Sequence, residues 1–565
     1  MSFETNDRGL YQINTDGEGR WIAPPIFIDA RMHDLNGEHY GNLVRFRDPE
    51  GQERTCIVLY SELMEGHEAI RRMADLGFRP SNRRKDIEAL RDHLLQANPN
   101  TTICSVPSHG WHNAQFIDNA DFDITQQEGQ RVMILDPNVA TGHRYNAAGT
   151  LEDWQNSVGR LSAGNSRLVF TICAAFAAAM LEPLRHPNIG LHLRGISSIG
   201  KTTALYTAGS VWGGGGGEGN NLGFLQSWRA TANGLELSCA LHNDSLLPLD
   251  EISLVNERDI GDIVYSLGNG IGKRRATRDI RSRPVIQFRL IFLSCGEQSL
   301  QEMMAAAGRR SRGGQESRLI DIPADPGHNR GIFETLHEHP NGAILSQCLT
   351  QAAKMYYGTP SRALTKYLTH NRQEAIAEVK ERQAHFVAKL QLPEDAAGEV
   401  YRVCGSIGMI AAVGEMVTRE GFSGWDFQEH LPTWSAHMCI QSWRLERGDT
   451  YQAHDIQAGL KGISYFLSRY AYRFQNLTTP PLNMQDRAGF WEEDVTNECR
   501  RYYIFRPVFI NEVCKGLDSR LILKALEEHH LLVTNEDDRY TYGKKITGEG
   551  RFRFYAVLSS VCDKF

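Results

Sequence analysis

The sequence lacks the patterns that would indicate a structural zinc site or a secreted protein. Its 11 cysteines are scattered, form no Cys-x-x-Cys pair, and none is spaced from a histidine as zinc ligands are. Unpaired thiols of this kind are typical of a reducing compartment. Residues 1–7 contain neither a basic segment nor an apolar core, so we expect no signal peptide and a cytoplasmic protein.

Long apolar runs and an excess of positive charge are also missing. The most apolar run, Leu168–Leu181, is too short to cross a bilayer and predicts a buried helix, so we expect no membrane partner. Because the net charge is −7, any nucleic acid would have to be held by a local basic segment. The 565 residues predict about three or four domains, at ~150 residues per domain.

The strongest motif is a glycine loop between a predicted strand and a predicted helix. Residues 195–202 match G-x-x-x-x-G-K-[S/T], after an apolar run at 189–193 and before helical periodicity at 201–211. In such a loop the backbone N–H groups and the helix start face a phosphate, and the lysine reaches the β- and γ-phosphates. We predict an ATP site in which the Thr202 hydroxyl holds Mg²⁺, with Thr203 as a less favoured substitute. The residues of this site are Gly195, Ile196, Ser197, Ser198, Ile199, Gly200, Lys201, Thr202 and Thr203.

Two later strand ends supply acidic and polar groups. The apolar run Leu246–Leu249 ends in Asp250 and Glu251, which predicts that Asp250 holds Mg²⁺ and that Glu251 polarises the attacking water. A second predicted strand, Val285–Leu293, ends at Ser294. We expect Ser294 to contact the γ-phosphate or that water.

Arginines further along the chain are candidates for additional phosphate contacts. Arg318 follows Ser317 just before an apolar strand, where its fixed fork could serve the γ-phosphate of a neighbouring subunit. Arg402, in an apolar helix predicted at 396–419, is a candidate nucleotide sensor, although a surface salt bridge explains it equally well. Three arginines compete with Arg318 for its role: Arg309, Arg310 and Arg312.

The most basic short segment, residues 268–283, follows the Asp-Glu pair. Its pattern is compatible with a β-hairpin, and two interpretations stand: a solvated charged loop, or a contact to a nucleic-acid backbone. Its position before the next strand favours DNA, bound by Lys273, Arg274, Arg275 and Arg278, with Arg281 and Arg283 completing the run.

Secondary-structure patterns divide the chain into predicted domains. An amino-terminal α+β domain (1–150) precedes a phosphate-loop core (151–330), a helical lid region (331–475) and a carboxy-terminal domain (476–565) whose helix and two-stranded wing resemble a winged helix. In the first domain we expect His109, Trp111 and His112 to pack rather than to bind a ligand. Strands are expected at 21–28, 41–47 and 54–58, the last two forming a hairpin around a turn at 48–51, and a further strand-rich piece is expected at 102–117 and 132–135. The expected helices are 87–96, 151–154, 166–184, 342–357, 373–390, 396–419, 431–447 and 519–529, and 476–494 is expected to be a linker.

Taken together, these motifs make the chain similar to a family of phosphate-loop ATPases catalogued as a domain of unknown function in phages and mobile elements. The resemblance rests on segments 149–154, 195–203, 210–213, 231–236, 249–251 and 268–273. Members include replicative helicases similar to the minichromosome-maintenance (MCM) helicases of the AAA+ class. The resemblance therefore implies an α/β AAA+ core, a homo-hexameric ring with ATP at subunit interfaces, a presensor hairpin in the channel at the basic run, and a carboxy-terminal winged helix.

Within that resemblance, Ser317-Arg318 matches the start of the MCM arginine-finger motif, with Leu319 in place of its aromatic residue. No primase signature is found, so a primase or initiator would lie in another chain. We predict an ATP-driven DNA helicase or translocase of a phage or mobile element. The alternative is an ATP-dependent switch, such as an initiator, loader or defence ATPase; a metabolic nucleotide kinase is disfavoured by chain length and by the trans arginine.

Overall fold

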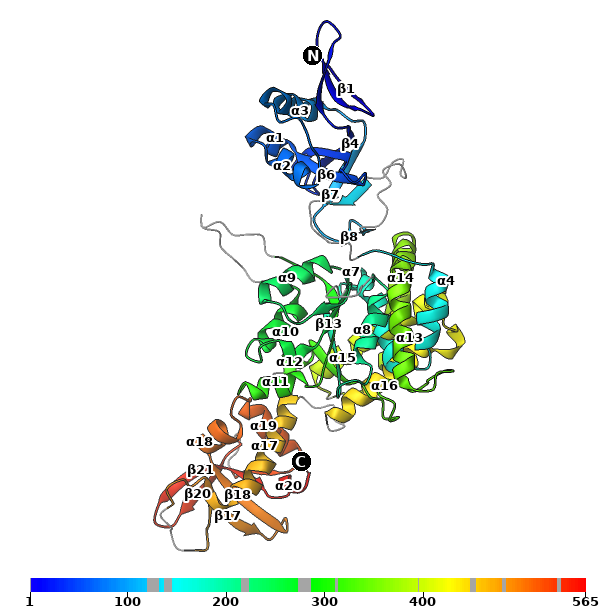
Figure 1. Ribbon diagram of the computed structural model, residues 1–565. Coiled ribbons are helices and arrows are strands. Elements are labelled where there is room, and N and C mark those ends of the chain that lie inside the picture. Colours follow the sequence, from blue (N-terminus) through cyan, green and yellow to red (C-terminus); the bar gives the residue numbers. More distant parts are fainter. Residues whose placement is uncertain are drawn as a thin grey trace.

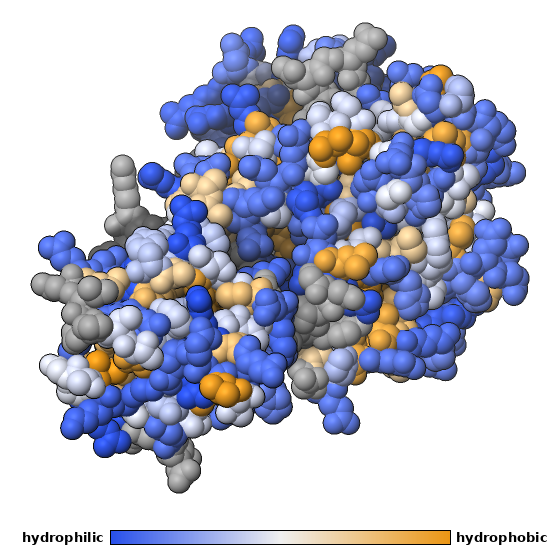
Figure 2. All heavy atoms as spheres, turned by 90° about the horizontal axis from the view of Figure 1, so that it is seen from below, coloured by the Kyte–Doolittle hydropathy of each residue, from blue (hydrophilic) through white to orange (hydrophobic). Residues whose placement is uncertain are grey.

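The computed structural model describes residues 2–118, 132–136, 145–214, 223–272, 286–309, 313–394, 396–447, 454–479, 484–535 and 540–564. An amino-terminal, a central and a carboxy-terminal part follow one another along the long axis of the molecule (Figure 1). On the face turned toward the viewer in Figure 2, hydrophilic residues dominate and hydrophobic ones form only small separate patches. The apolar side chains of the chain therefore gather mainly inside these parts.

The amino-terminal part is built on a mixed five-stranded sheet of order β10-β7-β4-β5-β6. The predicted hairpin is confirmed: β5 and β6 are antiparallel, and in the turn between them Asp48 Oδ1 accepts the N–H groups of Glu50 and Gln52. The elements are β1 (Ser2–Asn6), β2 (Gly9–Ile13), β3 (Gly19–Ala23), β4 (Ile26–His33), β5 (Gly41–Arg47), β6 (Glu53–Leu59), α1 (Tyr60–Glu65), α2 (Glu68–Asp75), α3 (Arg84–Gln96), β7 (Thr102–Val106) and β10 (Val132–Leu135).

A short hairpin, β8 (Gly110–His112) with β9 (Gln115–Ile117), joins this part to the central one. Trp111 lies in the central apolar core, where its indole N–H donates to the Ala179 carbonyl at 2.7 Å. The ring of His109 stacks on Tyr145 with 3.7 Å between ring centroids. The expectation that His109 and Trp111 pack is confirmed, whereas His112 is only half-buried. The hairpin anchors the amino-terminal part to the core.

The central part contains a parallel sheet of order β12-β13-β14-β11-β15. Every residue of β14 is buried, as expected for a parallel strand covered on both faces. The predicted strand before the glycine loop is confirmed as β11, whereas β14 begins five residues later than the predicted start at 285. The strands are β11 (Ile189–Arg194), β12 (Gln226–Ser227), β13 (Ser245–Asp250), β14 (Leu290–Gly296) and β15 (Leu319–Pro323).

Helices cover both faces of this sheet. The helix α4 begins at a capping box, because Thr150 Oγ1 accepts the N–H of Asp153 and the Asp153 carboxylate accepts the N–H of Thr150. The helices and short helical segments of this part are α4 (Leu151–Trp154), η1 (Gln155–Gly159), α5 (Arg160–Ser162), α6 (Ser166–Ala177), η2 (Ala178–Met180), α7 (Leu181–Leu184), α8 (Lys201–Gly209), α9 (Ala232–Leu241), η3 (Ile252–Leu254), α10 (Ile260–Asn269), α11 (Leu300–Ala306) and α12 (Gly313–Glu316).

Two helical runs pass a length and composition test for crossing a membrane. They are Ser166–Leu184 and Gly398–Arg419, and in an apolar 18-residue stretch of each, 83% and 78% is buried inside the molecule. The first run contains the apolar stretch Leu168–Leu181, which alone is too short to cross a bilayer, and extends it at both ends. Its burial confirms the prediction of a core helix.

The predicted helices after residue 340 are confirmed as α13 (Gly342–Met355), α14 (Thr359–Lys389), α15 (Gly398–Arg419) and α16 (Leu431–Glu446), with the short η4 (Phe427–Glu429) before α16. The helix α14 starts earlier than expected and is interrupted at Asn371, which has a non-helical backbone. These helices share one continuous apolar cluster with the sheet and α6.

The carboxy-terminal part is a sheet of order β16-β17-β18-β21-β19, with β20 paired to β21. The helix α17 packs into its apolar cluster, so this part begins before residue 476. The prediction of a linker at 476–494 is wrong for residues 489–494, because these form β17, which lies within the sheet and buries Phe490. The elements are α17 (His454–Arg469), η5 (Ala471–Arg473), β16 (Phe474–Asn476), β17 (Gly489–Asp494), β18 (Cys499–Phe505), α18 (Arg506–Val508), η6 (Phe509–Val513), α19 (Ser519–Glu528), β19 (Leu532–Val533), β20 (Tyr542–Ile546), β21 (Gly550–Leu558) and α20 (Val561–Lys564).

Candidate nucleotide-binding site

The glycine loop, residues 195–200, connects β11 to α8 at the carboxyl edge of the central sheet. Gly200 has a φ of 98°, and a Cβ there would lie 2.6 Å from Ile332 Cγ2, so both the turn and the packing require glycine. The backbone N–H groups of residues 196–200 form no hydrogen bond with the described residues. No side chain caps the start of α8 either. These free donors make the loop a cradle for an anion.

The ammonium group of Lys201 lies against the same loop. Its Nζ donates to the carbonyl oxygens of Gly195 at 2.6 Å and of Ile196 at 2.7 Å, and the residue is only 7% exposed. Among the described residues it has no carboxylate partner within ion-pair distance. A buried cation without a counter-ion is electrostatically suited to a bound phosphate.

Asp250, at the end of β13, lies beside the first turn of α8. The Thr202 hydroxyl is 3.4 Å from Asp250 Oδ1, and the Cys295 thiol donates to the same oxygen at 3.0 Å. Burial, together with the nearby Asp250 charge, raises the pKa of Cys295, so the thiol stays protonated and donates. A hydroxyl and a carboxylate oxygen side by side are the ligand types that Mg²⁺ takes, and this pair fits the ion.

Thr203 is engaged elsewhere. Its hydroxyl hydrogen-bonds the hydroxyl of Ser346 on α13, and the residue is 4% exposed. Thr202 is therefore the better placed of the two threonines for a metal.

Glu251 follows directly and has a φ of 58°, an uncommon conformation for a residue with a Cβ. Its Oε1 accepts a hydrogen bond from Ser253 Oγ at 2.6 Å. Such backbone strain, at roughly 1–2 kcal/mol, tends to be kept where function requires it.

A cavity of about 590 Å³ brings these groups together, a size typical of ligand pockets. The far side is formed by the segment 330–333 and the start of α13, which sequence reasoning missed. There the Ile332 N–H donates to the Ile199 carbonyl at 2.8 Å, and Arg330 supplies a second cation. No motif or strand pattern marks Arg330, since it lies in an irregular segment. The lining residues are 197–203, Asp250, Glu251, Cys295, Glu297, Arg330, Gly331, Phe333, Gly342, Ala343, Ser346 and Gln347.

Ser294 does not lie in this cavity, contrary to the expectation of a γ-phosphate contact. It is fully buried, where its Oγ accepts from Trp228 Nε1 at 2.9 Å and lies 3.0 Å from His192 Nδ1. Successive side chains of a strand point to opposite faces, so Cys295 turns toward Asp250 and Ser294 turns away. Burial lowers the pKa of His192 to about 4, so this internal contact is uncharged.

The predicted arginines also lie apart from the cavity. Arg402 is exposed on α15 and does not line it. Arg318 stands at the amino end of β15, where its Nε donates to Asn269 Oδ1 at 3.1 Å and its guanidinium covers the Tyr265 ring. Because Leu319 pairs with Gly190, the length of β11 separates Arg318 from the loop, roughly 20 Å at ~3.3 Å per residue.

Several predicted residues fall outside the described residues. Arg309 is described, with its Nη1 3.7 Å from Asp262 Oδ2. The predicted DNA contacts Lys273, Arg274, Arg275 and Arg278, with Arg281 and Arg283, lie outside the described residues, so the structure does not test them. Arg310 and Arg312 also lie outside the described residues.

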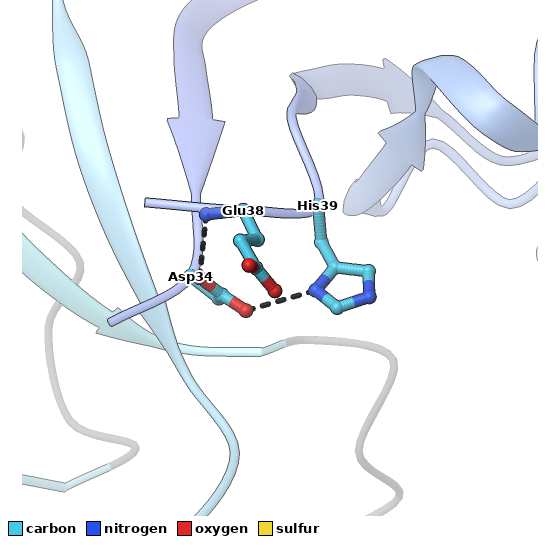
Figure 3. A group of neighbouring side chains, drawn as sticks. All are labelled: Asp34, Glu38 and His39. Atoms are coloured by element: carbon cyan, nitrogen blue, oxygen red, sulfur yellow. Dashed lines mark hydrogen bonds and ion pairs between the residues drawn. The ribbon is translucent and has the colours of Figure 1, made fainter. Parts of the chain in front are cut away.

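Two other features of the structure resemble ligand sites. Asp34, Glu38 and His39 cluster after β4 (Figure 3), but His39 Nδ1 and the Glu38 N–H already bind the Asp34 carboxylate at 2.8 Å each. Their hydrogen bond raises the pKa of His39 and lowers that of Asp34, as expected for an exposed turn. A larger cavity of about 910 Å³ lies between α14 and α15; it contains no glycine loop, so residues 195–203 remain the candidate nucleotide site.

Fold and site together define an α/β protein with a phosphate-loop motif at the carboxyl edge of a parallel sheet. The family described as "Domain of unknown function (DUF927)" matches residues 3–285, half of the chain, and the chain belongs to this family. A solved structure titled "SCCmec type IV Cch - active helicase" has a TM-score of 0.72 and 18% sequence identity, covering 99% of this chain and 98% of that chain. The two proteins thus share a fold over nearly their whole lengths. No curated protein matches the sequence.

Proposed function

We propose that this chain is an ATP-dependent DNA helicase or translocase of a phage or mobile element, similar to the AAA+ replicative helicases of the MCM type. The observation that carries the proposal is the convergence at one cavity of a loop with free N–H groups, a buried lysine and a Thr202–Asp250 pair. The shared fold with a structure titled an active helicase supports the same class.

ATP would lie with its phosphates on residues 195–200. Lys201 would leave the loop carbonyls for the β- and γ-phosphates. Thr202 and Asp250 would hold Mg²⁺, which when bound neutralises phosphate charge. Glu251 would orient the attacking water and accept its proton, while Arg330 would add positive charge near the phosphates.

The position of Arg318 fits assembly into a ring. In its own chain Arg318 is too far from the loop to touch the same ATP. An arginine from a neighbouring subunit would stabilise the charge that develops on the γ-phosphate. We therefore propose a homo-hexamer with ATP at the subunit interfaces.

Coupling to DNA would use the other predicted parts. Lys273, Arg274, Arg275 and Arg278 would form a channel hairpin that follows the backbone of one strand. The helices α13 to α16 would act as the lid of the ATP site, and the carboxy-terminal part, with β20 and β21 as its wing, would be a winged helix. A primase or initiator in another chain would complete replication.

The test is ATP-dependent unwinding of a forked duplex by wild type, Lys201→Ala, and a variant replacing Lys273, Arg274 and Arg275 with alanine. We expect the wild type to separate the strands and both variants to fail, with the triple variant still binding ATP. Hydrolysis without unwinding at either tail polarity would contradict the helicase and leave an ATP-dependent switch (an initiator, loader or defence ATPase).

A further inference from the structure

The β20–β21 hairpin at the carboxy-terminal end of the molecule carries an unusual concentration of positive charge. Residues 540–558 contain four cations, Lys544, Lys545, Arg551 and Arg553, against one acid, Glu549. The acid is already paired, since Arg487 Nη1 lies 2.8 Å from its Oε1 and Nη2 contacts Oε2. The positive charge of the hairpin is therefore not balanced from within it.

The strand register divides these cations between two faces. Lys545 faces Arg551, and Arg553 faces Gly543, which has no side chain. Directly paired residues and residues two apart on one strand share a face, so Lys545, Arg551 and Arg553 lie on one face, and all three are exposed. Lys544 lies on the other face, where its Nζ binds Glu492 at 2.6 Å. We call the three-cation face the basic face.

Lys545 and Arg551 form no ion pair with any described residue. Like charges directly opposite each other on neighbouring strands repel and weaken the sheet. Lysine on an edge strand can serve to prevent pairing with another sheet, which explains Lys545 on β20. It does not explain Arg551 and Arg553, because β21 lies inside the sheet, between β20 or β19 and β18.

The chemistry of the basic face fits phosphate groups. Arginine and lysine at neighbouring positions bind a nucleic-acid backbone without reading its sequence. Aromatic residues of the hairpin, Phe552 and Phe554, alternate onto the opposite face with Lys544. The basic face therefore offers no ring for stacking bases, which single-strand binding uses, and this favours a duplex. An acidic protein partner would need an apolar centre, which the cation row lacks.

Position supports the same partner. In Figure 1, β20 and β21 lie in the lower part of the molecule, on the side away from the central sheet. By the β18–β21 register, the exposed Arg506 follows Phe505, which pairs with Phe554. Another cation thus stands beside the end of the row.

We propose that the basic face of the β20–β21 hairpin, formed by Lys545, Arg551 and Arg553, binds the phosphate backbone of duplex DNA. This contact rests on the proposed function only in taking DNA as the partner. It is separate from the channel hairpin, from the ATP site and from any need for hydrolysis.

The experiment measures binding of the full chain to a labelled duplex of about 25 base pairs by fluorescence anisotropy, at salt concentrations from about 0.05 to 0.3 M. The test variant carries Lys545→Gln, Arg551→Gln and Arg553→Gln. The control carries Lys366→Gln, Lys380→Gln and Lys389→Gln, which removes the same charge from exposed positions of α14. A single Lys545→Gln variant guards against misfolding of the triple.

We expect the slope of log K against log salt to fall by about two to three for the triple and by about one for the single variant, with duplex binding more than ten-fold weaker for the triple at low salt. The control should keep the wild-type slope, and ATP hydrolysis without DNA should be unchanged in all three. A wild-type slope in the triple would overturn the proposal and point to an acidic protein partner. An equal loss on a single strand of the same length would overturn the assignment to duplex.

The two proposals fail separately. Repeating the titration in Lys201→Ala protein removes hydrolysis while leaving the hairpin intact. If the wild type does not unwind DNA but the triple variant still loses duplex binding, the helicase proposal fails and the hairpin site stands. If the wild type unwinds DNA and the triple variant keeps the wild-type salt slope, the helicase proposal stands and the hairpin site fails.

Discussion

Single side chains set the charge of the cavity. Lys201 and Arg330 are its cations, and Asp250, Glu251 and Glu297 are its acids. Without a metal these acids would repel a triphosphate, so we expect ATP binding to depend on Mg²⁺ beside Asp250 and on both cations. Among the described residues, the Arg330 guanidinium has one hydrogen bond, from Nη1 to the Glu334 carbonyl at 3.3 Å, and so can turn to a ligand.

Replacing Arg330 with alanine should weaken ATP binding about ten-fold or more, because a charge-assisted hydrogen bond contributes about 1.5–3 kcal/mol. Arg330→Lys should recover part of the loss, since lysine keeps the charge without the fork. Titration with a fluorescent ATP analogue measures both. Arg402→Ala, at an exposed position of α15, is the matched control and should bind like the wild type. Equal effects of the two alanine variants would refute the role of Arg330.

Asp244 gives a prediction about pH. It is 1% exposed and accepts the Trp111 N–H at 3.0 Å and the Asn243 amide at 2.8 Å, so it anchors the β8–β9 hairpin. Burial raises its pKa to about 6, from an ordinary 3.8. The folded state then takes up a proton before the unfolded state, so this group adds stability as pH falls from about 7 toward 4 and removes it as pH rises through 6.

Asp244→Asn should remove that pH dependence, which amounts to at most ~3 kcal/mol. Asparagine also tolerates the φ of 53° at this position. The melting temperature of the variant minus that of the wild type should be measured between pH 4.5 and 8. This difference should be most positive at pH 8 and should decrease as the pH is lowered. A difference independent of pH would show that the carboxyl does not titrate in this range.

At the scale of elements, the cavity depends on how closely the segment 330–333 approaches the glycine loop. Gly331 has a φ of 65°, and a Cβ there would lie 2.5 Å from the Ile199 carbonyl oxygen. Gly327, three residues before this segment, has a φ of 97°, but beyond its chain neighbours no atom of the described residues lies within 4 Å of its Cβ position. Comparing substitutions at these two glycines therefore distinguishes the cost of backbone strain from the cost of close packing.

Both Gly327→Ala and Gly331→Ala should cost about 1–2 kcal/mol in backbone strain. Only Gly331→Ala should push the segment away from the loop and also weaken ATP binding, by about ten-fold at a further ~1.4 kcal/mol. Calorimetric titration and thermal melting of both variants would test this. Comparable ATP affinities in the two would show that this contact does not shape the site.

At the scale of the whole molecule, the proposed role of Arg318 requires a second chain. It lies at the opposite edge of the sheet from the loop. An assembly that brings this edge to a neighbour's cavity would complete the site, and every interface of a closed ring would be the same.

Mixing Lys201→Ala with Arg318→Ala tests this arrangement. Each variant alone should lose ATP hydrolysis. In an equal mixture, about a quarter of the interfaces combine an intact loop with an intact arginine, so about a quarter of wild-type hydrolysis should return if subunits exchange freely. A mixture as inactive as its components, with exchange verified by labelled subunits, would mean that Arg318 does not act in trans.

Much of the fold could be predicted because short apolar runs, capping residues and helical periodicity are local. The strand β11, the capped helix α4, the β5–β6 hairpin and helices α13, α15, α16 and α19 lie where the sequence indicated, within a few residues. The start of β14 and the strand β17 were misjudged, because pairing with neighbours decides where a strand begins and whether a charged segment joins a sheet.

The sequence by itself determined the loop at 195–202 and the acidic strand end at Asp250, because a phosphate cradle needs fixed residues at fixed local spacing. Only the tertiary structure decided that Cys295 rather than Ser294 faces Asp250, that Arg330 rather than Arg402 lines the cavity, and that Arg318 lies at the far edge of the sheet. Those outcomes depend on strand register and on contacts between segments far apart in the chain, which no local pattern encodes.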